Sequence, residues 1–339
     1  MILHMTPAPL LALEALRTEF VTPRGVVRAV DGVDLSVDAG ETLAIVGESG
    51  SGKSVTALSV LRLFTRADRA RVSGRIVWRG RDGAAVDLAA LDERDLRDIR
   101  GSDIAVVFQD PSASLNPVFS IGAQIREAVR RHHPRTDAAA RAIELLRDVG
   151  IADPERRVDA FPHQLSGGMR QRAMIAIALA CAPRLLIADE PTTALDVTIQ
   201  AQIMRLLADL KRRHGMALLF ITHDLALVSE IADRVAVMYA GQVVETGRVD
   251  AVLRRPAHPY TRALLACRPV RRYRDDMPDE RILETIPGAP PRPGAIPRGC
   301  RFAPRCAAVV AACRSVDAVA LEASGDGRSV RCLRWRDIP

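Results

Sequence analysis

The sequence predicts an α/β fold in which a parallel sheet is covered by helices on both faces. Three observations indicate this fold class. Short apolar runs of buried-strand length alternate with segments of helical periodicity along much of the chain, as in sheets built from strand–helix–strand units. A glycine-rich octapeptide connects one apolar run to a helical segment. Two adjacent acids end another apolar run.

Composition agrees with a globular protein. The chain has 339 residues, enough for one large α/β unit and a smaller one. Hydrophobic residues make up 48% and charged residues 26%, which are ordinary values. No segment approaches the ~20 uninterrupted apolar residues of a membrane span, and the N-terminus lacks the layout of a secretory signal. We therefore expect the protein to stay in the cytosol. Its formal charge of +7 comes mainly from scattered arginines, which is weak evidence for nucleic-acid binding and would also suit a surface beside anionic lipids.

Each element of this fold has a local signal. Residues 10–38 alternate apolar and polar side chains and carry turn signals at residues 23–25 and 31–32, which predicts an antiparallel β subdomain. Helical spacing of apolar residues predicts a helical subdomain over about residues 111–165 and an amphipathic helix over residues 197–213. The other strand-like runs lie at residues 42–46, 75–78, 103–108, 185–188, 217–221 and 234–239.

The composition changes after about residue 261. Residues 287–297 are rich in proline and glycine, which predicts an extended connector, and a short cysteine-bearing tail follows. We expect a main domain over residues 10–261 and a C-terminal extension over residues 262–339. No internal repeat is present, so the chain holds one set of motifs.

The octapeptide G-E-S-G-S-G-K-S lies between the strand-like run 42–46 and a predicted helix over residues 55–64. In this setting such a loop binds phosphate, because its glycines let the backbone N–H groups converge and the helix dipole adds positive charge. Lys53 would reach the β- and γ-phosphates, and the Ser54 hydroxyl would ligate Mg²⁺. A flexible glycine turn without a ligand is the alternative. The loop residues are Gly47, Glu48, Ser49, Gly50, Ser51, Gly52, Lys53 and Ser54.

The apolar run 185–188 ends in Asp189 and Glu190. At the end of a buried strand, Asp189 can hold Mg²⁺ directly or through water, and Glu190 can polarise the attacking water. A pair of surface carboxylates at a turn is the alternative interpretation.

Further polar residues occupy positions from which they could act on the same nucleotide. Gln109 follows a strand-like run, and its amide could reach Mg²⁺ or the lytic water. His223 follows another such run and could contact a γ-phosphate, although a lone histidine is more often structural. Ser166, Gly167 and Gly168 begin a predicted helix, where a hydroxyl and two amides form a second anion site.

In their order along residues 10–261, these segments resemble the ATPase subunits of ABC transporters. The resemblance implies a P-loop NTPase core that binds ATP and Mg²⁺. It identifies Gly47–Ser54 as the Walker A loop, Gln109 as the Q-loop glutamine, residues 165–169 as the signature, Asp189 and Glu190 as the Walker B aspartate and catalytic glutamate, residues 194–196 as the D-loop, and His223 as the switch histidine. It also places Phe20 where an aromatic ring stacks on adenine, and a core-facing strand residue is the alternative there. The signature ends in Met169 where glutamine is commonest, after the residues that would contact phosphate.

The family mechanism implies partners. Two such domains face head to tail, and each ATP lies between one Walker A loop and the other domain's signature. A chain with one set of motifs therefore needs a second ATPase chain, either a copy of itself or a paralogue. The helical subdomain would contact two membrane permeases, which places the protein peripherally at the cytoplasmic face of the inner membrane.

Finer motifs resemble the dipeptide and oligopeptide importers, whose relatives also import nickel complexes or oligosaccharides. They are F-Q-D-P-S-A-S-L-N-P (residues 108–117), L-S-G-G-M-R-Q-R (165–172), H-P-Y-T-R-A-L-L (258–265), I-P-G-A-P-P (286–291) and G-C-R-F-A-P-R-C (299–306). An extracytoplasmic binding protein would select the solute, and peptide is the favoured class. Two other classes stay open: a soluble ABC ATPase that acts on nucleic acid, and a metal-binding protein with a vestigial nucleotide site. We expect no nucleic-acid partner.

The tail carries four cysteines, at Cys300, Cys306, Cys313 and Cys332. Four thiolates suit either Zn²⁺ or an iron–sulfur cluster. Similar tails in peptide-importer ATPases are associated with a 4Fe–4S cluster, which we rank above zinc, and four free thiols are the alternative. Cys181 and Cys267 are expected to be packing residues.

Overall fold

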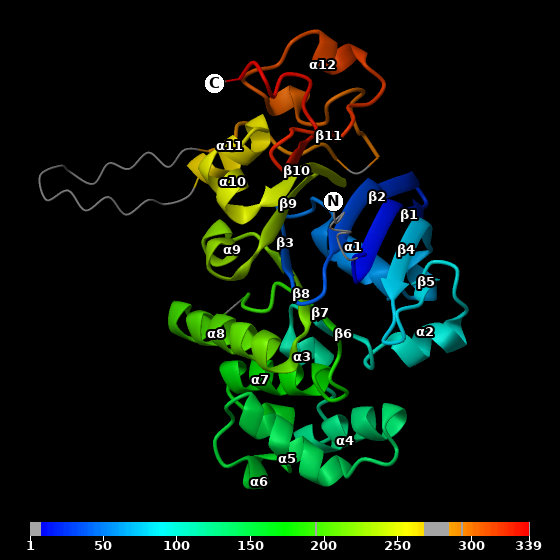
Figure 1. Ribbon diagram of the computed structural model, residues 1–339, viewed down its shortest axis with the longest axis vertical. Helices are drawn as coiled ribbons and strands as arrows, with labels where there is room; N and C mark the ends of the chain where they lie inside the picture. Colours follow the sequence, from blue (N-terminus) through cyan, green and yellow to red (C-terminus); the bar gives the residue numbers. More distant parts are fainter. Residues whose placement is uncertain (1–7, 194, 268–284, 293, 339) are drawn as a thin grey trace, which may run out of the picture.

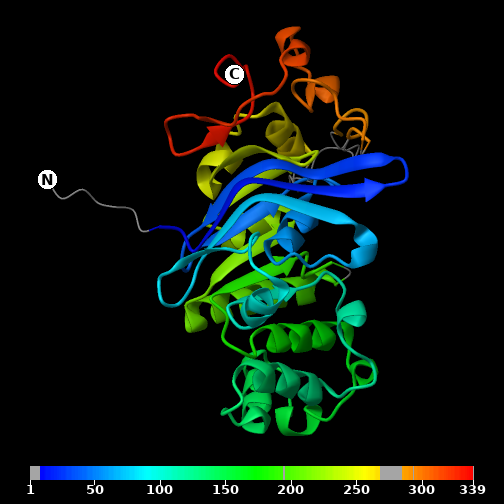
Figure 2. The ribbon, with the colours of Figure 1, turned by 90° about the vertical axis from the view of Figure 1, so that its right-hand side faces the viewer.

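The computed structural model describes residues 8–193, 195–267, 285–292 and 294–338. Two sheets form the centre of the molecule, and most of the helices lie beside the larger one (Figure 1). The predicted helical subdomain lies at one end of the long axis and the C-terminal extension at the other, which Figures 1 and 2 both show. The two sheets lie between these ends.

The larger sheet has the strand order β11-β12-β10-β9-β3-β8-β7-β6. The strands are β3 (Thr42–Val46), β6 (Ile104–Val107), β7 (Leu185–Asp189), β8 (Ala217–Thr222), β9 (Arg234–Tyr239), β10 (Gln242–Arg248), β11 (Glu322–Ala323) and β12 (Ser329–Val330). Pairing is parallel from β9 to β6, and β10, β12 and β11 add antiparallel. Every residue of β3, β7 and β8 is buried, so these strands read as unbroken apolar runs.

The smaller sheet is antiparallel, with the order β2-β1-β4-β5. Its strands are β1 (Leu11–Thr22), β2 (Gly25–Val37), β4 (Ala70–Arg79) and β5 (Ala85–Asp87). Strands β1 and β2 form a hairpin whose register runs from Leu11↔Val37 to Thr22↔Gly25. The predicted antiparallel subdomain is therefore present, and β4 comes from the run near residues 75–78.

The bounds of the helices are α1 (Lys53–Val60), α2 (Glu93–Ile99), α3 (Pro111–Ser114), α4 (Ile121–His132), α5 (Ala138–Asp148), α6 (Pro154–Arg157), α7 (Gly167–Ala178), α8 (Val197–His214), α9 (Leu225–Ile231), α10 (Val249–Arg254), α11 (Pro259–Ala266) and α12 (Ala312–Ser315). Helix α1 contacts strands of both sheets, and the outer face of the smaller sheet is not covered by a helix of the described residues in Figure 2. None of the helices in the described ranges combines the length and the apolar character that crossing a bilayer requires.

The helical subdomain follows its sequence pattern. Ser120 caps α4 by accepting a hydrogen bond from the Ala123 N–H, and Asp137 caps α5 in the same way. Helix α4 buries Ile121, Ile125 and Val129, which recur every four residues. One apolar stripe per helix thus packs against its neighbours.

One expectation needs correction. The helix predicted over residues 55–64 begins two residues earlier and ends at Val60, because Gly52 turns the chain into the helix and Arg62 adopts a positive φ of 50°. The C-terminal extension contributes to the central sheet, because its strand β12 pairs with β10. The described residues of the connector 287–297 form neither helix nor strand, as predicted.

Candidate nucleotide-binding and catalytic site

The glycine-rich loop lies at the carboxyl end of β3 and leads into α1. Gly47 has φ +152°, and a Cβ there would stand 2.2 Å from the Met238 carbonyl oxygen. Gly52, the N-cap of α1, has φ +103°. A cavity of about 710 Å³ opens at this loop, lined by Ala29, Glu48, Ser49, Gly50, Gly52, Lys53, Ser54, Val55, Gln109, Glu190 and His223. Its size suits a small-molecule ligand.

The glycines of this loop predict a graded response to alanine. Gly47→Ala should lower the free energy of unfolding by at least about 3 kcal/mol, because strain at φ +152° adds to the clash with Met238. Gly50 also has a positive φ, +76°, but nothing lies within 4 Å of its added Cβ. Gly50→Ala should therefore cost only about 1–2 kcal/mol. Urea unfolding of both variants measures this, and equal stabilities would contradict the geometry.

Lys53 lies near the end of the glycine-rich loop and is buried. Its Nζ donates hydrogen bonds to the carbonyl oxygens of Gly47 at 2.9 Å and Glu48 at 3.1 Å. Burial lowers the pKa of Lys53, while the carboxylates of Glu190, Asp189 and Glu48 act in the opposite direction. The lysine is thus held curled within the loop, next to the cavity.

Ser54 and Asp189 meet across the site. The Ser54 hydroxyl donates to Asp189 Oδ1 at 2.9 Å. Asp189 is 8% exposed, and burial raises the pKa of its carboxyl, with Ser54 opposing that shift. A hydroxyl and a carboxylate are hard oxygen donors of the kind that bind Mg²⁺ together with substrate phosphates. The residues present therefore fit the predicted magnesium ion.

Glu190 is the centre of a polar cluster. Its Oε2 accepts from Gln109 Nε2 at 3.2 Å and from Thr193 Oγ1 at 2.9 Å. His223 Nδ1 lies 3.3 Å from Oε1. Glu190 has φ +45°, a left-handed conformation that non-glycine residues adopt at some cost and that often marks functional sites. Gln109, Glu190 and His223, predicted separately, are thus brought together, and Thr193 was missed because nothing in its spacing marks it.

The signature residues lie elsewhere. Ser166 caps α7 and accepts from the Met169 N–H at 3.4 Å, and neither Ser166 nor the two glycines line the cavity described above. A Cβ on Gly168 would stand 3.0 Å from Ile199 Cγ2 of α8, so glycine lets these helices pack closely. Of the predicted D-loop, Ala194 lies outside the described residues, and Asp196 caps α8 through the Ile199 N–H at 2.9 Å.

Phe20 lies on β1 and packs edge-to-face against Phe64, with ring centroids 5.6 Å apart. It is not among the residues that line the cavity. Adenine stacking on Phe20 stays a prediction.

Three side chains around Glu48 were missed as site residues. The Tyr260 hydroxyl accepts from the Glu48 N–H at 2.9 Å, and Arg305 donates to both carboxylate oxygens of Glu48, at 2.7 and 3.0 Å. Tyr239 contacts Arg305 through its hydroxyl, at 3.4 Å. In the sequence, the motifs that contain Tyr260 and Arg305 indicated only a resemblance to the dipeptide and oligopeptide importers. Sequence spacing does not show that these two side chains contact the phosphate loop.

His258 explains the start of the H-P-Y motif. Burial lowers its pKa to about 3, so the ring is neutral, and Nδ1 accepts from the Tyr260 N–H at 3.0 Å. This cap begins α11 and sets Tyr260 beneath the phosphate loop.

The four tail cysteines lie around one cavity, but their arrangement does not support the expected metal site. Cys300, Cys306, Cys313 and Cys332 line one cavity of about 10 Å³, roughly the space of one water molecule. In the described ranges, no group of three or more His, Cys, Asp or Glu side chains is placed to hold a metal ion. Burial raises the pKa of Cys332 to about 11, which favours the neutral thiol. The predicted 4Fe–4S cluster, and zinc as its alternative, are not supported.

Cys181 is buried at 3% exposure, in agreement with a packing role.

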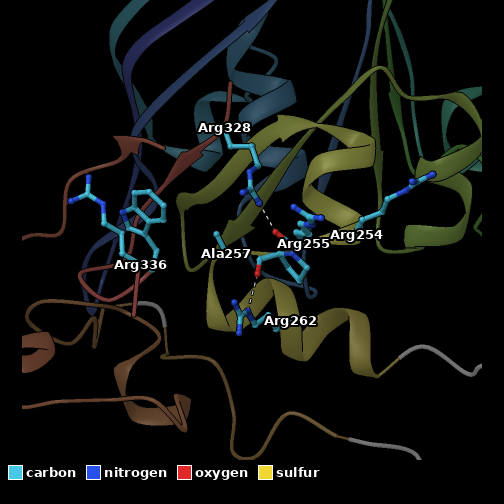
Figure 3. A pocket seen from close by; sticks show the side chains of 8 residues that line it. Arg254, Arg255, Ala257, Arg262, Arg328 and Arg336 are labelled. Atoms are coloured by element: carbon cyan, nitrogen blue, oxygen red, sulfur yellow. Dashed lines mark hydrogen bonds between the residues drawn. The ribbon is translucent and has the colours of Figure 1, made fainter. Parts of the chain in front are cut away.

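A second cavity of about 700 Å³ lies where the extension meets α10 and α11, and five arginines line it (Figure 3). Arg328 donates to the Arg255 carbonyl oxygen, and Arg262 donates to that of Pro256 at 2.8 Å. None of its lining residues is acidic, so it lacks the carboxylates that hydrolysis needs. These contacts fasten the extension to the main fold.

Three features lie at one edge of the parallel sheet: a glycine-rich phosphate loop, the Ser54–Asp189 pair, and Glu190 with its hydrogen-bond donors. Together they define a P-loop nucleoside triphosphatase. Comparison with known families narrows this class. The ABC transporter family matches residues 30–193, and the C-terminal region of oligopeptide/dipeptide transporters matches residues 244–313. The chain belongs to the family of ABC transporter ATP-binding proteins.

Individual relatives agree. A protein of Brucella abortus named as a peptide import ATP-binding protein is 52% identical, over 98% of this chain and 99% of its own length. A peptide ABC transporter ATP-binding protein of Sinorhizobium fredii is 50% identical, over 97% and 96%.

Solved structures give the same family. A dimeric ATP-binding cassette in a post-hydrolysis state with ADP and Pi has a TM-score of 0.62 and 27% identity, over 70% of this chain and 98% of that one. CbiO1 from Clostridium perfringens, part of an ABC transporter complex, has a TM-score of 0.59 and 30% identity, over 73% and 91%.

Proposed function

We propose that this chain hydrolyses ATP to power peptide import by an ABC transporter. The cluster in which Gln109, Thr193 and His223 surround Glu190 beside the phosphate loop is the single observation that carries the hydrolytic part. The peptide substrate is supported by the match to the oligopeptide/dipeptide transporter C-terminal region and by the names of the relatives. Nickel complexes and oligosaccharides are the other cargo classes to test.

Each site residue has a proposed role. The loop amides and Lys53 bind the β- and γ-phosphates, and Ser54, Asp189 and Gln109 hold Mg²⁺, which neutralises phosphate charge when bound. Glu190 orients and deprotonates the attacking water, because its carboxylate already accepts hydrogen bonds at the cavity. His223 contacts the γ-phosphate. No metal held by the tail cysteines takes part in this proposal.

We infer that a second ATPase chain completes the site. The Ser166 hydroxyl and the start of α7 lie outside this chain's own nucleotide cavity, so another molecule's signature would cover the bound ATP. The partner is a second copy or a paralogue. In this proposal residues 10–261 form the ATPase domain, with the helical subdomain at about 111–165, and residues 262–339 form the extension.

We also propose where the permeases bind, which would hold the protein peripherally at the cytoplasmic face of the membrane. A largely apolar groove of about 340 Å³ lies between β6, α4 and α7 and includes Phe108, next to Gln109. Shortly after Leu115 of the groove lining along the chain, Val118 is 71% and Phe119 51% exposed. Exposed apolar side chains beside a groove suit a helix of a partner protein.

A substitution that places a negative charge on this surface tests the proposal. Phe119→Asp should reduce co-purification of the permeases at least about tenfold, since central apolar contacts at interfaces contribute about 2 kcal/mol or more. Val310→Asp, at a 37% exposed position of the extension, is the matched control and should leave the complex intact. Equal recovery of permeases with both variants would exclude this surface.

The whole proposal is tested in proteoliposomes that contain this chain, its second ATPase and two permeases, with the extracytoplasmic binding protein outside. ATP-dependent uptake of labelled dipeptides or oligopeptides is the expected result. Uptake of nickel or oligosaccharide instead would change the cargo. ATPase activity stimulated by nucleic acid, without permeases, would refute the transport role.

A further inference from the structure

The C-terminal extension reaches the phosphate loop through a single arginine. Arg305 is 4% exposed at its side chain, and its five N–H donors all have acceptors. Nη1 and Nη2 bind the two carboxylate oxygens of Glu48 at 2.7 and 3.0 Å. The remaining donors reach the Tyr239 hydroxyl and the carbonyl oxygens of Ile286 and Pro287, at 2.9–3.4 Å. A buried, bidentate guanidinium–carboxylate pair of this kind has a defined geometry.

Glu48 belongs to the nucleotide cavity, which it helps to line. Its carbonyl oxygen accepts from Lys53 Nζ at 3.1 Å. Its N–H is taken by the Tyr260 hydroxyl. The charge of Glu48 therefore changes the electrostatic potential where the phosphates of ATP are expected to bind.

The extension that carries Arg305 is firmly attached to the fold. Strand β12 pairs with β10, and Arg301, 9% exposed, donates to Asp31 and to the Ala240 carbonyl oxygen. The Arg305 guanidinium also lies over the rings of Tyr239 and Phe302, 5.8 and 6.0 Å from their centroids. Arg305 is thus held in place before any ligand binds.

We propose that Arg305 is a positioning residue for ATP: by pairing with Glu48 it cancels a negative charge at the phosphate loop, so that the C-terminal extension sets the affinity of the site for nucleotide. This inference rests on the proposed ATPase function. Without Arg305, the Glu48 carboxylate would repel the polyphosphate across a partly buried site, where one unit charge changes affinity about tenfold.

Four proteins test this charge balance. ATP binding is measured by calorimetry on the full-length chain without added magnesium, so that no hydrolysis occurs. Arg305→Met should weaken ATP binding about tenfold, because it leaves the negative charge of Glu48 unpaired. Glu48→Gln should tighten ATP binding by several-fold, because it leaves the positive charge of Arg305 unpaired. The double variant should return close to the wild-type affinity. With Mg²⁺, Arg305→Met should raise the KM for ATP and leave kcat nearly unchanged.

The design separates charge from structure. Arg298→Met removes an arginine of the same extension that pairs with exposed Asp317, and it should bind ATP as the wild type does. Arg305→Lys keeps the charge and should recover most of the affinity. If Arg305→Met does not fold, Glu48→Gln alone decides, since a purely structural pair predicts weaker rather than tighter binding. A double variant as weak as Arg305→Met would overturn the inference, whereas wild-type protein that binds ATP without hydrolysing it would contradict the proposed function instead.

Discussion

Glu190→Gln is expected to slow ATP hydrolysis by about 10²–10⁴-fold, the usual contribution of a general base. The amide cannot accept a proton from water, yet it keeps the size of the carboxylate and can still bind Thr193 and Gln109. ATP binding and ATP-driven dimerisation should therefore persist. Phosphate release and size-exclusion chromatography with ATP measure the two properties.

Glu230→Gln is the matched control, because Glu230 is an exposed carboxylate on α9. That variant should keep wild-type turnover. Near-normal phosphate release from Glu190→Gln would refute the role given to Glu190, and loss of ATP binding would show that the residue mainly supports the loop.

Lys53→Met should weaken ATP binding at least about a hundredfold, because hydrogen bonds to charged groups contribute about 1.5–3 kcal/mol each. The lysine is 5% exposed, and in the free protein its charge is held by two backbone carbonyl oxygens of the loop. Because burying the Lys53 charge costs desolvation free energy, its removal should leave the unfolding midpoint of the free protein unchanged or slightly higher. Calorimetry with ATP and thermal unfolding without it give the two readings.

Lys211→Met provides the comparison. Lys211, in the last turn of α8, is also a partly buried lysine, with 18% of its side chain exposed. It forms an ion pair with Asp233 at 3.0 Å. It should keep wild-type ATP affinity and lose some stability. Wild-type ATP affinity in Lys53→Met would remove Lys53 from the phosphate site.

Much of the fold was predictable because its strands are buried on both faces. Strands such as β7 and β8 read as apolar runs and could be found without any knowledge of their neighbours. The tail strand β12 has only two residues, and such a short segment has no periodicity of its own. Its place in the central sheet depends on its partner β10, which sequence alone did not identify.

The same division holds for the site. The sequence by itself determined the phosphate loop, the acid pair and the order of Gln109, Ser166 and His223, because these roles require particular residue types at fixed local positions. Only the tertiary structure decided which side chains meet: Thr193 and His223 at Glu190, Arg305 at Glu48, and the four tail cysteines around one small cavity. The reason is physical. Local chemistry acts over a few consecutive residues, whereas the Arg305–Glu48 pair joins positions 257 residues apart, and only packing of the whole chain brings such positions within hydrogen-bond distance.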